Sequence, residues 1–415
     1  MAQKRHRLAQ RRKAVGLSQE GLAELIGVDR STVVRWERGE THPHPWHRPR
    51  LARVLTVSIE DLAELLAPTD EPPEEPERVV AGFGHPRVDR MVRSLRARLL
   101  VRGLPAGPEP DPSGRGLAEV EAEIGTIHRT YQRADYTAAV RALPALLTDA
   151  ERLARPAAGQ PAEPAHRLLA ISYLAASKLA AKLGDGVLAW VAADRVVSSA
   201  LVAGDRAVAA VGAYQVARSL LQEPERLDDA GEVLDAAIDD LARHSRPDSR
   251  TDLSVRGALL LLASVVAARG HRPTAAARQL AAAAELAELL RRDENRLWTG
   301  FGPTNVRIHQ VSVAVELRRP ERAIEIGNRL DTSALPPPLV SRRAQVHLDL
   351  AAALCLTSGG GPAGLLHLLE AERIAPELVR VSYAGRSLVG ELLRHERRAR
   401  TPGLRQLAAR AGVLD

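Results

Sequence analysis

Apolar residues recur at steps of three and four positions along most of the chain, a spacing that places them on one side of a helix. From about residue 116 to 411, one such segment follows another with only short breaks between them. Small residues carry much of this spacing, as at Ala189, Ala192 and Ala193. The pattern predicts an all-α protein with closely packed helices.

The breaks between these segments recur at a regular distance, roughly 42 to 50 residues, which is typical of stacked helical hairpins. They are Ala134-Asp135, Gly184-Asp185, Arg226-Leu227, Gly270-His271, Arg319-Pro320 and Gly360-Gly361. The period exceeds the roughly 34 residues of a tetratricopeptide repeat (TPR) and overlaps that of HEAT repeats. The small-residue pattern, and endings such as residues 371–376, resemble TPR units with lengthened helices.

The chain divides into three parts. Residues 1–67 are predicted to form a domain of five short helices. Residues 68–115 are predicted to be an acidic, proline-rich linker that carries one basic amphipathic helix at 87–102. Residues 116–415 are predicted to form the repeat domain, a TPR-like helical-hairpin solenoid.

Composition narrows the class of protein. With 415 residues, the chain exceeds what one hydrophobic core usually spans, so two cores are expected. Cys355 is the only cysteine, which excludes an internal disulfide and a thiolate metal site. The basic N-terminus is followed by no apolar segment, and the longest apolar stretch, 257–268, is too short to cross a bilayer. We therefore expect a cytoplasmic protein without a membrane partner.

The charge pattern favours a polyanionic partner. The formal net charge is +7 and the isoelectric point is about 10. Basic residues gather in the segments 4–13, 30–38, 48–53 and 87–102, and the acidic run 70–77 separates the last two.

Two short helices with clear end signals follow the first helix, which is expected at about residues 3–14. Ser18 is a good N-cap for a helix at 19–26, and Gly27 is suited to end it. Asp29 is expected to cap a further helix at 30–38. Leu22, Leu25 and Ile26 are predicted to form the buried stripe of the helix at 19–26. Two helices joined by such a turn make a helix-turn-helix unit.

The helix at 30–38 has two distinct sides. Val33 and Trp36 lie three positions apart and are expected to point inward. Arg30, Ser31 and Arg35 are left facing outward, where arginine can donate two hydrogen bonds to guanine in the major groove. Because these arginines have no packing purpose, double-stranded DNA is favoured over a purely protein-binding role for this unit.

At these positions the chain resembles the XRE (lambda-repressor-like) family. The matching motifs are Leu17-Ser-Gln-Glu20, Leu22-Ala23, Gly27-Val28, Arg30-Ser-Thr32 and Arg35-Trp-Glu-Arg-Gly39. The resemblance implies that Gln19 and Arg38 contact the DNA backbone. By the same resemblance, Arg30, Ser31 and Arg35 face the bases. It also implies a partly buried pair between Arg12 and Glu37. The predicted DNA-contacting set is Gln19, Arg30, Ser31, Thr32, Arg35 and Arg38.

The sequence departs from the family pattern at two places. Gly21 stands where glutamate is usual, so Ser18 lacks its reciprocal capping partner. The loop at 42–47 is bulkier than usual and holds His42, His44 and His47. With prolines between them and no fourth ligand, these histidines are expected to lie near phosphates, and no metal site is predicted.

The repeat domain carries no phosphate-binding loop, nucleophile elbow or HExxH motif. We therefore predict neither an enzyme nor a cofactor. Cys355 is expected to be buried and inert, because alanine and leucine surround it in sequence.

One segment interrupts the helical array with aromatic and polar residues. It is Trp298-Thr-Gly-Phe-Gly-Pro-Thr-Asn-Val306, and it opens a helix whose N-terminus favours an anion. Two interpretations stand: a loop that caps one hairpin, or a ligand site in which Asn305 binds a peptide backbone. The predicted ligand-binding set is Trp190, Tyr214, Arg218, Phe301, Thr304, Asn305 and His309, with the first three lining the same concave face.

The two-domain plan is similar to that of the RRNPP regulators, and closer still to arginine-rich, actinobacterial-style XRE regulators with such repeats. In the RRNPP family a short peptide binds the repeat groove and alters dimer geometry and DNA binding. The resemblance implies a homodimeric, sequence-specific transcription regulator with a small-molecule or peptide effector. The alternative is a scaffold whose repeats bind a partner protein and whose N-terminal unit only recruits it to DNA.

Overall fold

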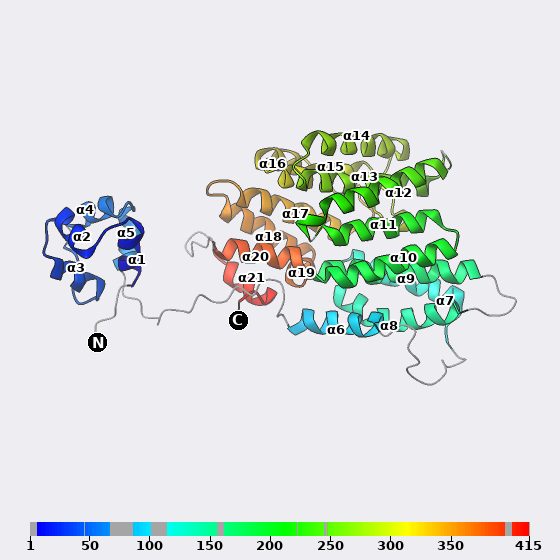
Figure 1. Cartoon of the computed structure of the whole chain (residues 1–415), viewed down its shortest axis with the longest axis horizontal. Coiled ribbons are helices and arrows are strands. Elements are labelled where there is room, and N and C mark those ends of the chain that lie inside the picture. Colours follow the sequence, from blue (N-terminus) through cyan, green and yellow to red (C-terminus); the bar gives the residue numbers. More distant parts are fainter. Residues whose placement is uncertain are drawn as a thin grey trace. The chain divides into compact units, whose positions relative to one another are not determined.

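The computed structural model describes residues 6–44, 46–66, 86–100, 114–155, 162–221, 223–244, 246, 248–394 and 401–414. The chain forms two compact units, residues 1–78 and 79–415, which are described separately (Figure 1). Apart from an isolated bridge between Glu294 and Phe301, the regular elements of the described residues are helices. The predicted all-α class is confirmed.

The first unit contains the five short helices that the sequence predicts. They are α1 (His6–Ala14), α2 (Gln19–Ile26), α3 (Arg30–Glu37), α4 (Arg48–Val54) and α5 (Ile59–Leu66). One apolar core holds them together, because side chains from all five helices are buried in it. Its members include Leu8, Leu22, Val33, Trp36, Leu51, Leu55 and Leu62.

Most of the predicted end signals act as expected in this unit. The Ser18 hydroxyl accepts a hydrogen bond of 2.9 Å from the Gly21 amide, and Gly27 ends α2 in the left-handed region with φ 81°. Two expectations were wrong. Asp29 occupies the N-cap position of α3, but its side chain makes no capping hydrogen bond. Leu25 is 45% exposed, because Leu22, Ala23 and Ile26 already fill the buried side of α2.

The second unit is a series of helical hairpins preceded by α6 (Pro86–Leu100). The hairpins are α7 (Leu117–Gln132) with α8 (Tyr136–Leu153), α9 (Ala162–Leu183) with α10 (Gly186–Val202), and α11 (Arg206–Leu220) with η1 (Pro224–Arg226) and α12 (Leu227–His244). They continue with α13 (Arg250–Arg269) and α14 (Pro273–Leu290), η2 (Arg296–Trp298), α15 (Pro303–Glu316) and α16 (Pro320–Asn328), and α17 (Val340–Cys355) and α18 (Gly361–Ile374). The chain then forms α19 (Pro376–Arg380), α20 (Tyr383–Arg394) and α21 (Leu404–Ala411). The predicted breaks fall between the two helices of each hairpin.

One turn design recurs along this unit. Asp135, Asp185 and Asp205 are N-caps whose carboxylates accept a hydrogen bond from the backbone amide three residues further on, at 2.9–3.0 Å. The residue before each aspartate has a positive φ, as at Gly184 (91°) and Gly204 (65°). The turn before Asp205 was not among the predicted breaks, because it joins two hairpins rather than the two helices of one.

The first helices of successive hairpins form an inner layer. Helices α7, α9, α11, α13, α15 and α17 contact one another in that order, and α17 also contacts α7. The carboxylate of Glu377 on α19 strengthens this closure, since it accepts hydrogen bonds from the Thr137 amide (2.9 Å) and hydroxyl (2.6 Å) and pairs with Arg87. The last hairpins therefore pack back on the first, and Figure 1 shows the C-terminal helices (orange to red) near α9.

Helix α6 packs on this second unit. Its apolar side, Val88, Met91, Leu95 and Leu99, is part of the same hydrophobic core as the hairpins. Arg96 and Arg98 form ion pairs with Asp185 (2.8 Å) and Glu151 (2.5 Å). The apolar side of α6 is thus already covered within its own chain. Within the predicted linker at 68–115, residues 68–85 and 101–113 lie outside the described residues.

Helix α13 is long and apolar enough to cross a membrane by length and composition, in contrast to the expectation that the apolar stretch at 257–268 is too short. Within the fold, 72% of that window is buried. Neighbouring helices cover it, among them α11, α12, α14 and α15. Its composition is therefore that of a central core helix.

Gly257 on α13 lets the aromatic ring of Phe301 approach the helix backbone. A Cβ atom at this position would lie 2.0 Å from the ring, and Phe301 itself is fully buried. We expect Gly257→Ala to destabilise the second unit by about 1–3 kcal/mol, because the ring has no space to move into. Denaturant unfolding followed by circular dichroism measures the change.

A matched control lies in α12. Gly231→Ala adds the same methyl group to a helix at a position where no atom lies within 4 Å. This change should stabilise the helix by about 0.5–1 kcal/mol, because alanine loses less backbone entropy. If both substitutions changed the free energy of unfolding equally, the close approach of Phe301 to α13 would not be what requires glycine at position 257.

Candidate functional site

Helix α3 presents one buried side and one exposed side. Val33 and Trp36 are buried in the core of the first unit. Arg30, Ser31, Arg35 and Arg38 are exposed, and Thr32 is half-buried. The outward set predicted from the sequence therefore lies on one accessible surface of a single short helix and its C-cap.

A buried ion pair holds α3 in place from behind. The Arg12 guanidinium on α1 donates to the Glu37 carboxylate at 2.7 Å, and the side chains of both residues are less than 10% exposed. Arg12 also donates to the Leu17 carbonyl at 2.7 Å. The Gln19 side chain donates to the same carboxylate at 2.7 Å, so it points toward α3 and not into solvent. The pair implied by the XRE resemblance is present.

The exposed arginines have only weak competing partners. Arg30 lies 3.3 Å from Glu20, and Arg38 lies 3.8 Å from Glu40, with all four side chains well exposed. Such surface pairs contribute about 0–1 kcal/mol, so a phosphate or a base edge can replace them at little cost. Arg35 has no ion-pair partner within the described part of the chain.

The loop after α3 is built around stacked rings. The rings of His44 and Trp46 stack at 4.4 Å with an interplanar angle of 4°, and the Trp46 side chain is exposed. The Arg48 side chain donates to the Pro43 carbonyl at 3.2 Å, which ties the loop to α4. Searched over the described residues, the chain holds no group of three potential metal-ligating side chains.

Comparison with known proteins decides the family. A helix-turn-helix family profile matches residues 8–62. A segment of 58 residues is 40% identical to an HTH-type transcriptional regulator of Archaeoglobus fulgidus and covers 14% of this chain and 83% of that protein. A second such regulator, from Methanothermobacter thermautotrophicus, is 41% identical over 56 residues, covering 13% of this chain and 81% of its own.

The chain belongs to the helix-turn-helix family of transcriptional regulators.

Among solved structures, the crystal structure of Bacillus thuringiensis PlcR in complex with the peptide PapR7 and DNA is similar, with a TM-score of 0.31 and 14% identity. The match covers 70% of this chain and 96% of that one. The helix-turn-helix family is a class of DNA-binding regulators and not of enzymes, which agrees with the expectation from the motif content.

The second unit of the regulator carries a polar cluster on its inner helices, here called the inner cluster. Its cations are Lys178 and Lys182 on α9, Arg218 on α11 and Arg342 on α17. Burial, together with the two arginines, lowers the pKa of each lysine to about 7. All four side chains nevertheless keep partial access to solvent, so they are enclosed by protein without being fully packed.

Further polar groups on the inner helices complete the inner cluster. Tyr214 is hydrogen-bonded to Arg218, and burial raises the pKa of Tyr131. The neutral form of His309 is favoured, because burial and then Arg342 lower its pKa to about 3. Burial raises the pKa of Asp349 to about 6, although Ser312 and Gln345 donate hydrogen bonds to it.

The segment between α14 and α15 packs against this cluster. The Trp298 ring stacks on His128 of α7 at 4.0 Å, and its carbonyl accepts from the Lys178 ammonium at 3.4 Å. Arg342 donates to the Thr299 carbonyl at 3.4 Å. Leu297 and Trp298 both have left-handed backbones, with φ of 45° and 56°, a strained conformation that the surrounding contacts must maintain.

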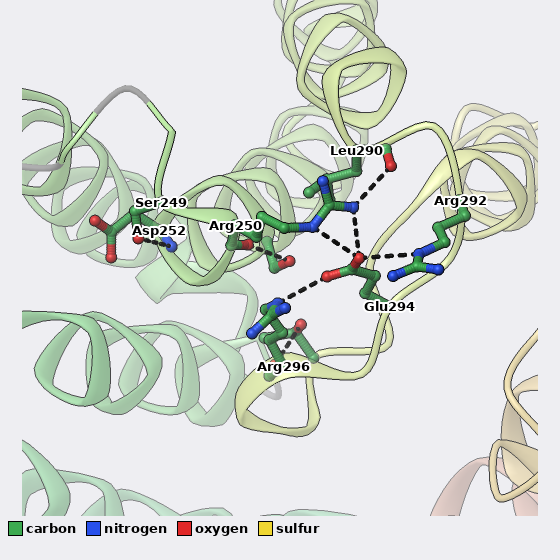
Figure 2. Close-up of polar contacts among 9 residues, drawn as sticks. Ser249, Arg250, Asp252, Leu290, Arg292, Glu294 and Arg296 are labelled. Atoms are coloured by element: carbon green, nitrogen blue, oxygen red, sulfur yellow. Dashed lines mark hydrogen bonds and ion pairs between the residues drawn. The ribbon is translucent and has the colours of Figure 1, made fainter.

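A single carboxylate anchors this segment. Figure 2 shows Glu294 between three arginines that donate to it: Arg250 at 2.5 and 2.9 Å, Arg292 at 3.2 Å and Arg296 at 2.7 Å. These hydrogen bonds, led by that of Arg250, lower the pKa of Glu294 to about 2 against the opposing effect of burial. The segment is therefore joined to α13 by a carboxylate that stays ionised.

The structure brings together only part of the predicted ligand-binding set. Tyr214, Arg218 and His309 belong to the inner cluster. The buried Asn305 precedes His309 by one turn, and its backbone carbonyl accepts a hydrogen bond from the His309 Nδ1 at 2.9 Å. Trp190 lies on α10, the second helix of its hairpin, where it is 47% exposed.

Two other members of that set serve the core. Phe301 is fully buried in an apolar cluster. The Thr304 amide donates to Asp293 at 3.1 Å, so the N-terminus of α15 already has an anion from its own chain. The two lysines and Arg342 were missed, although lysine is otherwise rare in this chain. Cys355, expected to be buried, is half-buried, and burial raises the pKa of its thiol to about 11.

We expect Glu37→Gln to loosen α3. The substitution leaves the Arg12 charge buried without a carboxylate, which typically destabilises by about 3–5 kcal/mol. Hydrogen exchange of peptides from α3 should become faster by a corresponding factor, while peptides of the second unit stay unchanged. Glu40→Gln, at an exposed pair, is the control, and similar exchange rates in both variants would contradict the role of the buried pair.

We also expect the Glu294 contacts to depend on pH. Because the folded-state pKa lies below the ordinary 4.5, the stabilisation is complete above about pH 4.5 and is lost as pH falls toward 2. Glu294→Gln should lower the free energy of unfolding by about 2–3 kcal/mol at pH 7 and by much less at pH 3. Denaturant titrations followed by far-ultraviolet circular dichroism measure both values.

Glu325→Gln provides the matched control for that experiment. Glu325 also pairs with two arginines, Arg322 and Arg329, but at the exposed surface. Its loss should change stability little at either pH. A difference between wild type and Glu294→Gln that stays constant from pH 7 to pH 3 would show that the carboxylate charge is not what anchors the segment.

Proposed function

We propose that this protein is a sequence-specific transcription regulator that inserts α3 into the major groove of double-stranded DNA. The observation that carries the proposal is the exposed set Arg30, Ser31, Arg35 and Arg38, on the side of α3 opposite its buried anchors. Arginine and hydroxyl groups on a helix that can enter the groove are the donors that base edges accept.

The residues of this surface have different proposed roles. Arg30 and Arg35 bind guanine edges, and Ser31 and Thr32 supply shorter hydroxyl contacts. Arg38 binds a phosphate, as do the backbone amides at the start of α2 near Gln19. The Gln19 side chain supports α3 through Glu37, so its contribution to the phosphate contact is positional.

We further propose that the regulator acts in the cytoplasm as a homodimer, because one five-helix unit reads one half-site and paired half-sites need two. The apolar side of α6 is covered within the chain, so the dimer contact falls elsewhere. The TPR-like repeat unit would bind a small-molecule or peptide effector that biases two arrangements of the DNA-binding units. The inner cluster supports this role.

Base reading by Arg35 is tested with DNA fragments that the protein selects from a random library. Arg35→Ala should lower the ratio of selected-site to random-site affinity by about 5- to 150-fold, the loss expected for one bidentate base contact. Competition gel shifts measure this ratio. A ratio that stays at the wild-type value would refute the assignment of Arg35 to a base.

Arg38→Ala is the matched comparison. Because we assign Arg38 to a phosphate, its removal should weaken binding to selected and random sites equally. It should also reduce the slope of log affinity against log salt concentration by about one. Arg53→Ala, which changes an exposed arginine on α4, controls for net charge. If Arg38→Ala changes the ratio and Arg35→Ala does not, the two roles are exchanged.

A further inference from the structure

The chain uses lysine at very few positions. Only four of its 58 basic residues are lysines, and the rest are arginines. Lys4 and Lys13 lie near the start of the chain. The other two, Lys178 and Lys182, are the only lysines beyond residue 13, and they lie one turn apart on α9. Every other basic charge of the repeat unit is carried by arginine or histidine.

Lys178 and Lys182 are therefore exceptions in a unit that otherwise uses arginine for its positive charge. Arginine keeps its charge in almost any environment, whereas the compact ammonium group of lysine can lose its proton when it is enclosed. Surface solubility does not explain them, because arginine serves that purpose throughout the chain. Their position in the inner cluster indicates that the chemistry of the lysine amine, and not only its charge, is used there.

Among the described residues, the cations of the inner cluster outnumber the carboxylates coupled to them. Four cations are coupled to one another, and the carboxylate coupled to them is Asp349, whose pKa is raised to about 6. Its oxygens already accept hydrogen bonds from Ser312 and Gln345. The contacts that Lys178 and Arg342 make with backbone carbonyls, at 3.4 Å, are long and neutral. Enclosed positive charge without an anion is destabilising, and such arrangements concentrate at functional sites.

Two fully enclosed polar atoms of the repeat unit, one of them beside the inner cluster, have no described hydrogen-bond partner. The Tyr136 hydroxyl has no hydrogen-bond partner among the described residues, although the side chain is 0% exposed. Its ring lies 5.9 Å from the Lys182 ammonium, and it is coupled to Arg218. The Asn305 Oδ1 is likewise without a described partner in a side chain that is 1% exposed. Buried polar atoms of this kind usually have a partner.

We propose that Lys178, Lys182, Arg218 and Arg342 bind the effector through an anionic group, a carboxylate or a phosphate, with the Tyr136 hydroxyl as an additional donor. The proposal rests on the effector role assigned above to the repeat unit, and it names the chemistry of that effector. The side-chain oxygen of Asn305, Oδ1, would accept a hydrogen bond from a donor group of the same ligand.

Anion binding is expected to be coupled to proton uptake. The titratable and charged groups next to the two lysines are His128, Tyr136, Arg218, Arg342 and Asp349, and Tyr131 and His309 are coupled to the same two arginines. A bound anion raises the lysine pKa values from about 7, so binding at pH 7.5 protonates part of the amine population. Below about pH 6 both lysines are already charged, and any remaining uptake would come from Asp349.

The test uses the full-length chain without DNA and two probes, inorganic pyrophosphate and citrate, each compared with sodium chloride at equal ionic strength. We expect either probe to raise the thermal unfolding midpoint of the wild type by about 2–4 °C. The larger shift identifies phosphate or carboxylate as the preferred group. Calorimetry at pH 7.5 in two buffers of different ionisation enthalpy should show proton uptake on binding, and this measurement needs no variant.

The decisive variant is Lys178→Met/Lys182→Met, which keeps the side-chain length and removes both charges. Without a probe it should unfold at a higher temperature than the wild type, because two uncompensated charges are gone. It should gain only the general stabilisation that these salts give any protein. Arg133→Met/Arg141→Met, at two exposed arginines, is the matched control and should respond as the wild type does.

Two results would overturn the proposal: equal probe-dependent shifts in the wild type and the lysine variant, or a lysine variant that is less stable than the wild type without a probe. The second result would show that the lysines are structural. Neither result affects the Arg35 experiment on DNA, so failure of the anion site and failure of the DNA-binding proposal are distinguishable.

Discussion

The buried ion pair between Arg12 and Glu37 is the contact on which the proposed DNA-binding surface depends. Both charges are removed from water, so each is tolerated only while the other is in place. The same two side chains also bind the Leu17 carbonyl and the Gln19 amide, so one carboxylate joins α1, the start of α2 and α3. A helix of eight residues has little stability by itself. This pair, with the apolar anchors beneath it, gives α3 the fixed orientation that reading a groove requires.

The repeat unit is likewise held in one arrangement by contacts between residues far apart in the sequence. Its inner helices follow one another and close, because α17 meets α7 and Glu377 of α19 binds the start of α8. The segment before α15 is held against this inner layer at both ends, by Glu294 among its arginines and by Trp298 on His128. These contacts maintain left-handed backbone at a tryptophan, which few sequences allow.

The two units use positive charge in opposite ways. On α3 the arginines are exposed, so solvent screens them and they are available to a polyanion at little cost in stability. In the inner cluster the cations are enclosed, and burial, together with the charges of Arg218 and Arg342, lowers the pKa of Lys178 and Lys182 to about 7. The first arrangement suits a large partner that arrives from solution. The second suits a small one that replaces solvent inside the fold.

Features that depend on near neighbours along the chain could be predicted before the fold was known. They are the helices from their three- and four-residue spacing, the start of α2 from its capping residue Ser18, and the outward side of α3. Which distant residues meet depends on how the helices pack against one another. Phe301 faces the core because Gly257 leaves room for it, while Trp190 stays outside. The meeting of Lys178 with Arg342 joins helices more than 150 residues apart, and no local periodicity encodes it. Burial and coupling of charge arise from that convergence, because they depend on distances in space and not on spacing along the chain.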